Sequence, residues 1–317
     1  MTLDNILEEI NNAENIVILT HENPDGDAIG SSLAMYHALK TYGKNVEVII
    51  PEYSRTFEFL PGANEIKKEG SIDEYDLAIS LDCASMKMLN GFSKYFENAK
   101  SKVVIDHHGT NSMYGDFNFV NPDAPACAQI LIVILNYFNM EITKEIGTCI
   151  LAGIITDTGG FKYSGVTAET FEFVAWLLNK GVNVSSVYRK VLQVHSRGNF
   201  ELHRIASDRL EFLEDGKIAF TYITLEDEEK VNAETGDHEG IVDIGRDVEG
   251  VEVSIFVREI KNKGLKISLR SSEYVNVSDI ALLFGGGGHP RAAGCNMNTT
   301  IAQAKDRIIN EVRANLK

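Results

Sequence analysis

Short apolar runs alternate with longer mixed segments in the first half of this chain. Residues 15–20 (NIVILT) are apolar almost throughout, which predicts a strand buried in a sheet. Three further runs of this kind lie at residues 46–50, 77–81 and 102–105. Between the first two runs, residues 30–39 predict a helix, and Gly43 is placed to end it. Strands and helices that alternate in this way predict an α/β domain with a mainly parallel sheet and helices on both faces.

The pattern changes in the second half of the chain. Residues 167–181 predict a helix that begins after Thr167 and ends at Gly181. Residues 187–204 are more polar and lack a clean period, so we assign them to a linker between domains at 1–186 and 205–317. The elements predicted beyond it are strands at 217–224, 251–259 and 264–271, and helices from Val277 onward and at 301–316. This mixture predicts a smaller α+β domain.

No segment of the sequence indicates secretion or a membrane span. The apolar stretch at 126–138 is interrupted by Gln129 and Asn136 and is shorter than the about 20 residues that cross a bilayer. We expect it to form a buried helix. A signal peptide begins with positive charge and continues with an apolar run. The N-terminal region of this chain instead carries four acidic residues, Asp4, Glu8, Glu9 and Glu14. The four cysteines form no C-x-x-C pair, which is typical of reduced thiols in a cytoplasmic protein.

The net charge limits the partners that the chain can bind. Asp and Glu number 46 against 30 Lys and Arg, which gives a formal charge of −16. Proteins that hold long nucleic acids do so through broad basic surfaces, which release counterions from the strand. A chain this acidic is instead suited to a short phosphate-bearing ligand, held by metal ions and a few arginines.

Carboxylate and imidazole side chains follow four of the apolar runs. After residues 15–20 come His21, Asp25 and Asp27, and after 77–81 comes Asp82. Three residues directly follow the run at 102–105: Asp106, His107 and His108. Asp157 follows the apolar run at 149–156. Because the carboxyl ends of parallel strands meet at one edge of a sheet, we expect these groups to converge there.

Such a cluster predicts a metal site. Neighbouring carboxylates raise one another's pKa unless a cation lies among them. Mixed carboxylate and imidazole ligands suit Mn²⁺ or Mg²⁺, and Co²⁺ is a further alternative. The nearest thiol, Cys83, should point away from Asp82, so zinc is less favoured. Two ions about 3.5–4 Å apart that share one carboxylate would form a phosphoryl-transfer site.

The combined motifs resemble the DHH phosphoesterase superfamily. The motifs that carry this resemblance are H-x-x-x-D-x-D from His21, an isolated Asp82, D-H-H from Asp106, and G-x-x-x-D-T from Gly153. The second domain resembles the DHH-associated C-terminal domain through GGGGH and RAAG, at residues 285–289 and 291–294. The resemblance covers nearly the whole chain, and the most similar subgroup is the standalone nanoRNase A and pAp phosphatase group.

The resemblance implies roles for the matching residues. One ion would be held by His21, Asp25 and Asp82, and the other by Asp27, Asp82, His107 and Asp157. Asp82 would bridge the two ions, which would activate a shared water for in-line attack on phosphorus. Asp106 would orient the histidines or coordinate a metal weakly, and His108 would face the substrate phosphate, so the resemblance implies that both are catalytic residues.

Substrate contacts are expected mainly in the second domain. Glycines allow backbone N–H groups to approach an anion, so Gly285, Gly286, Gly287 and Gly288 are predicted to form an anion-binding nest. His289 and Arg291 would add donors to a terminal phosphate. Arg270 and Ser271, at the end of a predicted strand, and Arg197 in the linker are further candidates.

The resemblance implies a two-metal phosphodiesterase that degrades RNA or DNA of two to about four nucleotides, including linear dinucleotides such as pApA, and that also acts on pAp. Three alternatives stay open: a manganese-dependent pyrophosphatase, a RecJ-type exonuclease and a non-catalytic nucleotide sensor. A pyrophosphatase has a lysine- and arginine-rich second domain, and a RecJ-type chain is longer with an added oligonucleotide-binding domain. A sensor does not need a complete ligand set. A homodimer is also considered, and no membrane partner is expected.

Overall fold

The computed structural model describes residues 3–163 and 165–317. The chain divides into two compact units, Met1–Val194 and His195–Lys317. The division falls inside the segment 187–204 that the sequence assigned to a linker. Most of residues 187–204 are helical in the structure. They include the end of α8 (Val184–Leu192) and the first turns of α9 (Arg197–Asp208).

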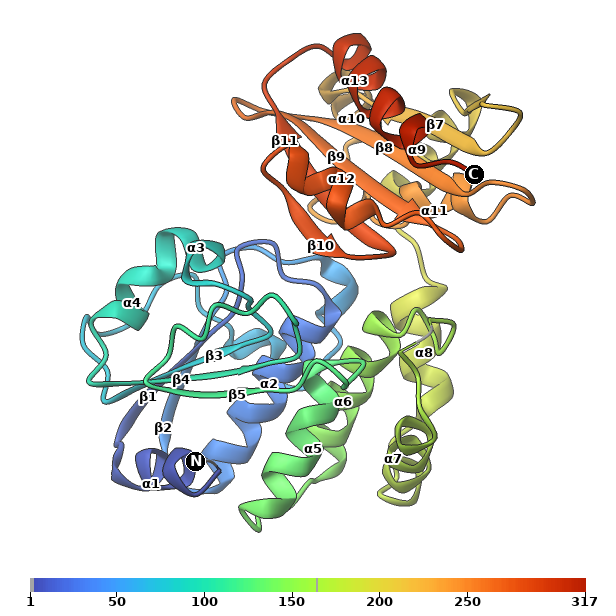
Figure 1. The fold of residues 1–317 in the computed structure, drawn as a ribbon. Coiled ribbons are helices and arrows are strands. Elements are labelled where there is room, and N and C mark those ends of the chain that lie inside the picture. The colour runs from blue at the N-terminus through green and yellow to red at the C-terminus, as the bar shows by residue number, and fades with distance from the viewer. Residues whose placement is uncertain (1–2, 164) are drawn as a thin grey trace. The chain divides into compact units, whose positions relative to one another are not determined.

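The first unit contains a parallel sheet of five strands in the order β2-β1-β3-β4-β5 (Figure 1). The strands are β1 (Asn15–Leu19), β2 (Asn45–Ile49), β3 (Leu77–Leu81), β4 (Ser101–Asp106) and β5 (Phe117–Val120). The four predicted strands are confirmed, and β5 is an addition. It is half-buried along its length, which leaves it without the apolar run that marked the other four.

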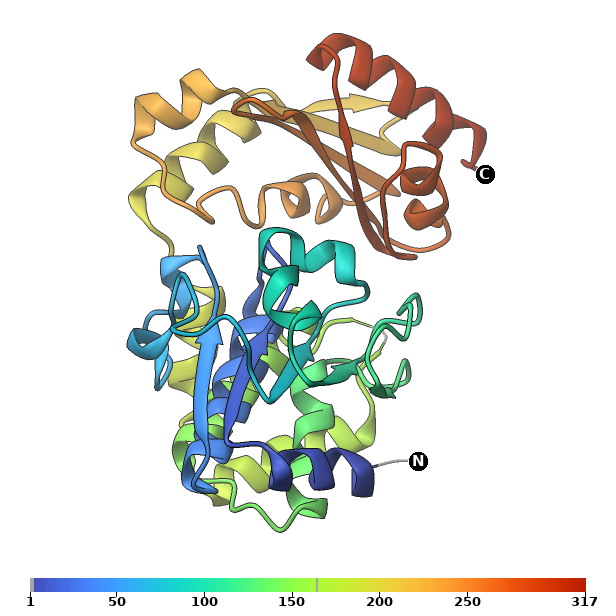
Figure 2. The same cartoon turned by 90° about the vertical axis from the view of Figure 1, so that its left-hand side faces the viewer.

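Helices cover both faces of this sheet, as predicted (Figures 1 and 2). The larger core lies under α2 (Gly26–Thr41), α5 (Cys127–Tyr137) and α6 (Lys144–Asp157), and α4 (Ser93–Glu97) packs on the smaller core at the other face. The remaining elements of this unit are α1 (Leu3–Asn12), α3 (Met86–Leu89), α7 (Ala168–Asn179), η1 (Arg55–Phe57), η2 (Ala63–Glu65) and η3 (Asn90–Phe92). The apolar stretch at 126–138 forms the buried helix α5, as expected.

The structure corrects the prediction for residues 149–156. We expected this apolar run to deliver Asp157 from the edge of the sheet, but it is the second half of helix α6. Residues 149–155 are all buried, so the helix shows no polar face that would distinguish it from a buried strand. Asp157 is the last residue of α6, and it comes to the site from a helix end.

Helix α2 also begins earlier than predicted, at Gly26. Asp25 is its N-cap, and the Asp25 carboxylate accepts hydrogen bonds from the backbone N–H groups of Asp27 and Ala28. Gly43 adopts a left-handed φ of 87° just beyond the helix, which ends α2 as expected.

The second unit is the predicted α+β domain. Its six-stranded sheet has the order β10-β11-β9-β8-β7-β6, with β7 and β8 parallel and the other neighbours antiparallel. The strands are β6 (Glu211–Leu213), β7 (Ile218–Ile223), β8 (Val253–Ile260), β9 (Gly264–Ser271), β10 (Gly287–His289) and β11 (Ala292–Met297). Helices α12 (Val277–Leu283) and α13 (Ile301–Ala314) pack on one face. Helices α9 and α11 (Ile241–Arg246) pack on the other face, near α10 (Leu225–Val231).

Two further findings concern the cysteines and the length of the helices. All four cysteines are buried and unpaired, in line with the sequence. Among residues 3–163 and 165–317, no helix has the length and apolar character needed to cross a bilayer.

Candidate metal centre

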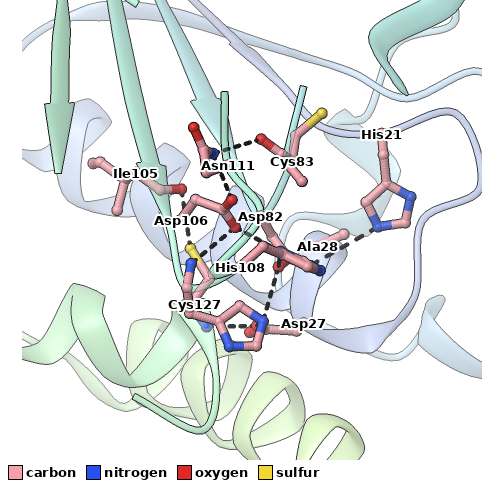
Figure 3. A network of polar contacts seen from close by, with 12 residues as sticks. His21, Asp27, Ala28, Asp82, Cys83, Ile105, Asp106, His108, Asn111 and Cys127 are labelled. Carbon is pink, nitrogen blue, oxygen red and sulfur yellow. Dashed lines mark hydrogen bonds and ion pairs between the residues drawn. The ribbon is translucent and has the colours of Figure 1, made fainter. Parts of the chain in front are cut away.

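The predicted ligands of the first unit meet at the carboxyl edge of its sheet. Asp82 directly follows β3, Asp106 ends β4, and His107 and His108 come next along the chain. His21 lies just after β1, and Figure 3 shows it beside Asp82. Two helix ends complete the group: Asp25 and Asp27 at the start of α2, and Asp157 at the end of α6.

Asp82 lies at the centre of this group. Its Oδ1 is 3.4 Å from Nε2 of His107 and 3.6 Å from Nδ1 of His108. Its Oδ2 is 3.9 Å from Nε2 of His21 (Figure 3). Asp82 is only 2% exposed, and its Oδ1 accepts no hydrogen bond from any residue that the structure describes. A buried carboxylate oxygen without a donor is costly, and a bound cation would satisfy it.

His107 turns one ring nitrogen toward three carboxylates. Its Nε2 lies 3.1 Å from Asp157 and 4.0 Å from Asp27, in addition to Asp82. Its Nδ1 is 3.2 Å from the carbonyl oxygen of Ala124, which can only accept a hydrogen bond. Nδ1 therefore carries the proton in the neutral ring, and Nε2 is the nitrogen suited to a metal.

Within the first unit, three sets of side chains have ligand atoms close enough for a cation, all within 4.8 Å of one another in each set. They are His21, Asp25 and Asp82; Asp27, Asp82 and His107; and Asp82, Asp106 and His108. The first has the same members as one ligand set that the resemblance implied, and the second contains three of the four residues of the other set, without Asp157. Asp82 belongs to each of these three sets, which is the arrangement expected of a bridging carboxylate.

The pKa values reflect the crowding of negative charge. Burial and the charges of Asp82 and Asp157 raise the pKa of Asp25 to about 6, although part of the residue is exposed. The same causes raise the pKa of Asp27 well above its usual range. Burial opposes the charged form of His107, but the nearby carboxylates of Asp157 and Asp82 outweigh it and raise its pKa to about 12. The cluster therefore has a high affinity for positive charge, and its carboxylates and imidazoles fit a divalent cation.

Asp27 is held in place by two neighbouring helices. Its carboxylate accepts the N–H of Cys127 at 2.6 Å and of Ala128 at 2.9 Å, so it caps α5, whose own N-cap residue offers no side-chain bond. A Cβ added at Gly153 of α6 would lie 2.6 Å from Asp27 Oδ1. Gly153 was identified in the sequence only as part of a motif, and the structure shows that its missing side chain makes room for this carboxylate.

Asp106 is an orienting group for His108. Its Oδ1 accepts the backbone N–H of His107 at 2.8 Å and lies 2.8 Å from Nδ1 of His108. Its Oδ2 accepts Nδ2–H of Asn111 at 2.6 Å (Figure 3). Hydrogen bonds and nearby carboxylates raise the pKa of His108 in spite of burial, so this ring favours the protonated form.

No motif in the sequence pointed to Asn111. Its amide group donates to Asp106 and, at 3.2 Å, to the carbonyl of Cys83, while its Oδ1 accepts the N–H of Met113 at 2.7 Å. The loop after D-H-H is thereby tied to the end of β3, where Asp82 lies. In the sequence, Asn111 is an asparagine three residues after His108, which is ordinary for a loop. Only its contacts in the structure identify its role.

We expect Asn111→Asp to lower kcat by about 10- to 100-fold, the usual cost of losing a group that orients an active residue. The new carboxylate would face Asp106 where an N–H donor stood, and His108 would lose its fixed orientation. Steady-state kinetics, metal content and melting temperature should be measured together, with Asn139→Asp, at an exposed position, as the matched control. Wild-type kcat in Asn111→Asp would contradict this role.

The predicted substrate residues lie in the second unit, chiefly on β9 and on the β10–β11 hairpin. Arg270 and Ser271 end β9, and Arg291 precedes β11. Nη1 of Arg291 donates to the carbonyl of Val275 at 2.8 Å and lies 3.4 Å from Oγ of Ser271. His289 is exposed on β10, whereas Arg197 is an exposed residue at the start of α9, a different element.

The glycine run differs from the predicted nest of four amides. The N–H groups of Gly285 and Gly286 donate to the carbonyls of Leu282 and Ala281, so they cap the end of α12. A Cβ at Gly286 would lie 2.1 Å from the carbonyl oxygen of Gly294, which explains why a glycine is needed there. An anion-binding role therefore stays a prediction for Gly287 and Gly288, in β10, and is not supported for the amides of the first two glycines.

Comparisons with known proteins agree with this arrangement. Models of two domain families match the chain: the DHH family, N-terminal domain, at residues 15–154, and the DHHA1 domain at 215–317. A Thermus thermophilus protein named bifunctional oligoribonuclease and PAP phosphatase NrnA is 35% identical, over 95% of this chain and 90% of its own length. A Mycoplasma genitalium protein of the same name is 26% identical, over 91% of this chain and 90% of its own length.

A solved structure is similar over both units. The crystal structure of an exopolyphosphatase-related protein from Bacteroides fragilis has a TM-score of 0.90 and 29% identity, and it covers 98% of this chain and 95% of that one. The similarity therefore includes the metal-ligand edge of the first unit and the sheet of the second.

Proposed function

Because the chain belongs to the DHH family, we propose that it degrades very short oligonucleotides to nucleoside monophosphates and also dephosphorylates pAp. The protein is a metal-dependent hydrolase of phosphodiester and phosphate bonds. The observation that carries the proposal is Asp82, whose carboxylate belongs to all three candidate metal sets of the first unit. The relative from Thermus thermophilus supports the choice of substrate through its name.

The site residues have distinct tasks in this proposal. His21, Asp25 and Asp82 would hold one divalent cation, and Asp27, Asp82, His107 and Asp157 the other. Bound there, the cations would supply an activated water and offset the charge of the reacting phosphate. We propose Mn²⁺ as the ion, since the carboxylate ligands suit both Mn²⁺ and Mg²⁺ and the imidazoles of His21 and His107 favour Mn²⁺.

His108 supplies the proton donor. Asp106 holds its Nδ1, so Nε2 is the nitrogen that can donate to a phosphate oxygen. A positioned donor of this kind stabilises the charge that develops on the phosphate in the transition state. The four buried, unpaired cysteines support a cytoplasmic location as part of the same proposal. A homodimer stays a prediction.

The test is a Mn²⁺-supplied assay with pApA, pAp, pyrophosphate and a single strand of about 20 nucleotides. The proposal expects turnover of pApA to nucleoside monophosphates and of pAp to AMP. Turnover of pyrophosphate alone would favour the pyrophosphatase alternative. Binding of pApA without turnover of any substrate would favour the sensor.

We expect kcat/KM to fall as the strand grows from two nucleotides to about 20. The reason is charge: binding a long strand requires many phosphate contacts, and a chain with a formal charge of −16 repels the strand beyond the site. The measurement is initial rate against strand length at fixed ionic strength. Efficiency that rises with length would contradict this prediction and favour the RecJ-type alternative.

A further inference from the structure

One strip of the second unit's sheet carries basic side chains, of which the sequence identified only Arg270. Burial alternates along β9: Leu265, Ile267 and Leu269 are buried against α12 and α13, and the residues between them are half-buried. Those residues are Lys266, Ser268 and Arg270. Because side chains alternate between the faces of a strand, these three share the opposite face.

The neighbouring strand leaves this strip accessible. In Figure 1, β9 lies between β8 and β11. On β11 the partners of Lys266, Ser268 and Arg270 are Asn296, Gly294 and Ala292. All three are small or polar, and none of them is buried. A Cβ at Gly294 would lie 3.7 Å from Cε of Lys266, so the lysine stem passes close to this glycine.

Two cations face each other at one end of the strip. Arg258 on β8 is the direct cross-strand partner of Lys266 on β9. Like charges in directly opposite positions destabilise an antiparallel pair, so such a pair needs compensation. Glu228 of α10 offers part of it, with Oε1 at 3.3 Å from Nη1 of Arg258. Nε of Arg258 is buried and donates to no acceptor among the residues that the structure describes.

A histidine next to this pair responds to its charge. His238 is half-buried, and burial together with the charges of Arg258 and Lys266 lowers its pKa to about 3. The ring therefore stays neutral near pH 7. Its low pKa agrees with a local positive potential in a chain that is acidic as a whole.

We infer that Arg258 and Lys266, with His238 beside them, form a phosphate subsite for the nucleotide substrate, at the end of a strip that begins at Arg270. The subsite rests on the proposed function, because its ligand is a phosphate of the short oligonucleotide or of pAp. An arginine and a lysine on adjacent strands match a phosphate dianion, since each can donate a charge-assisted hydrogen bond. The unpaired Nε of Arg258 would gain an acceptor from that anion.

The experiment measures binding to the full chain in excess chelator, so that the metal centre makes no contribution. The probes are pAp, AMP and inorganic phosphate, and the method is calorimetry. The variants are Lys266→Met and Arg258→Met, and Arg258→Lys retains the charge. Lys263→Met, at an exposed position on the turn of the same hairpin, is the matched control.

We expect Lys266→Met and Arg258→Met each to weaken pAp binding by about 10- to 100-fold, the range for losing a hydrogen bond to a charged group. Arg258→Lys should restore part of the affinity, and Lys263→Met should bind as wild type does. In Mn²⁺-supplied assays the two Met variants should raise KM and leave kcat unchanged. Unchanged pAp binding in Lys266→Met, with a wild-type melting temperature, would overturn the subsite.

Two outcomes separate this inference from the proposed function. Lys266-dependent binding of pAp by a protein that hydrolyses none of the substrates would support the subsite and contradict the activity. Turnover of pApA with the same KM in wild type and Lys266→Met would support the activity and overturn the subsite. Binding of inorganic phosphate as tightly as pAp would overturn its assignment to a nucleotide phosphate.

Discussion

Asp82→Asn is expected to lower phosphodiester hydrolysis by at least about 10³-fold, because the charge stabilisation that two cations supply is worth several kcal/mol and each 1.36 kcal/mol is tenfold in rate. The substitution keeps the shape of the side chain and removes its charge. Asp82 belongs to all three candidate metal sets of the first unit, so both cations should lose a ligand together. The measurements are kcat/KM for pApA and metal content after dialysis.

The matched control is Asp73→Asn, which neutralises an exposed carboxylate of the same unit. It should retain wild-type activity and metal content. Near pH 7 the metal-free Asp82→Asn should melt below the metal-free wild type, because in spite of burial the nearby His107, His108 and His21 lower the pKa of Asp82 to about 2, so its ionised form stabilises the fold. Two tightly bound cations in Asp82→Asn would show that this carboxylate is no bridge.

His108→Ala is expected to lower kcat by about 10²–10³-fold, the usual cost of removing one donor to a developing charge. Metal content should not change, because Nδ1 of His108 bonds to Asp106 at 2.8 Å and its other nitrogen is the proposed donor to substrate. His107→Ala should behave differently and lose metal, since Nε2 of His107 lies among Asp27, Asp82 and Asp157.

The metal measurement decides between two roles for His108, because Asp82, Asp106 and His108 are also close enough together to hold a cation. Metal lost from His108→Ala and kept in His107→Ala would reverse the two assignments. His203→Ala, a substitution on α9 of the second unit, is a control for the loss of an imidazole. It should leave both kcat and metal content unchanged.

The sequence alone determined the parallel sheet and most of the residues at its edge. Runs such as residues 15–20 and 77–81 are buried on both faces of the sheet. Their nearly continuous apolar composition therefore predicts strands without any knowledge of the rest of the fold. A parallel sheet brings the carboxyl ends of its strands to one edge, so His21, Asp82 and His107 were expected there without any coordinates. The D-H-H and glycine motifs then identified the family.

The tertiary structure decided how the remaining groups reach and support that edge. Asp157 comes from the end of α6. The sequence did not show this, because the second half of α6 is buried all round and has no polar face to reveal the helical period. The amides of Gly285 and Gly286 cap α12, which no residue pattern showed. The contacts of Asn111 with Asp106, and of Arg258 with Lys266, depend on loop path and strand register. Such contacts join residues by their positions in space, so the order of residues along the chain does not determine them.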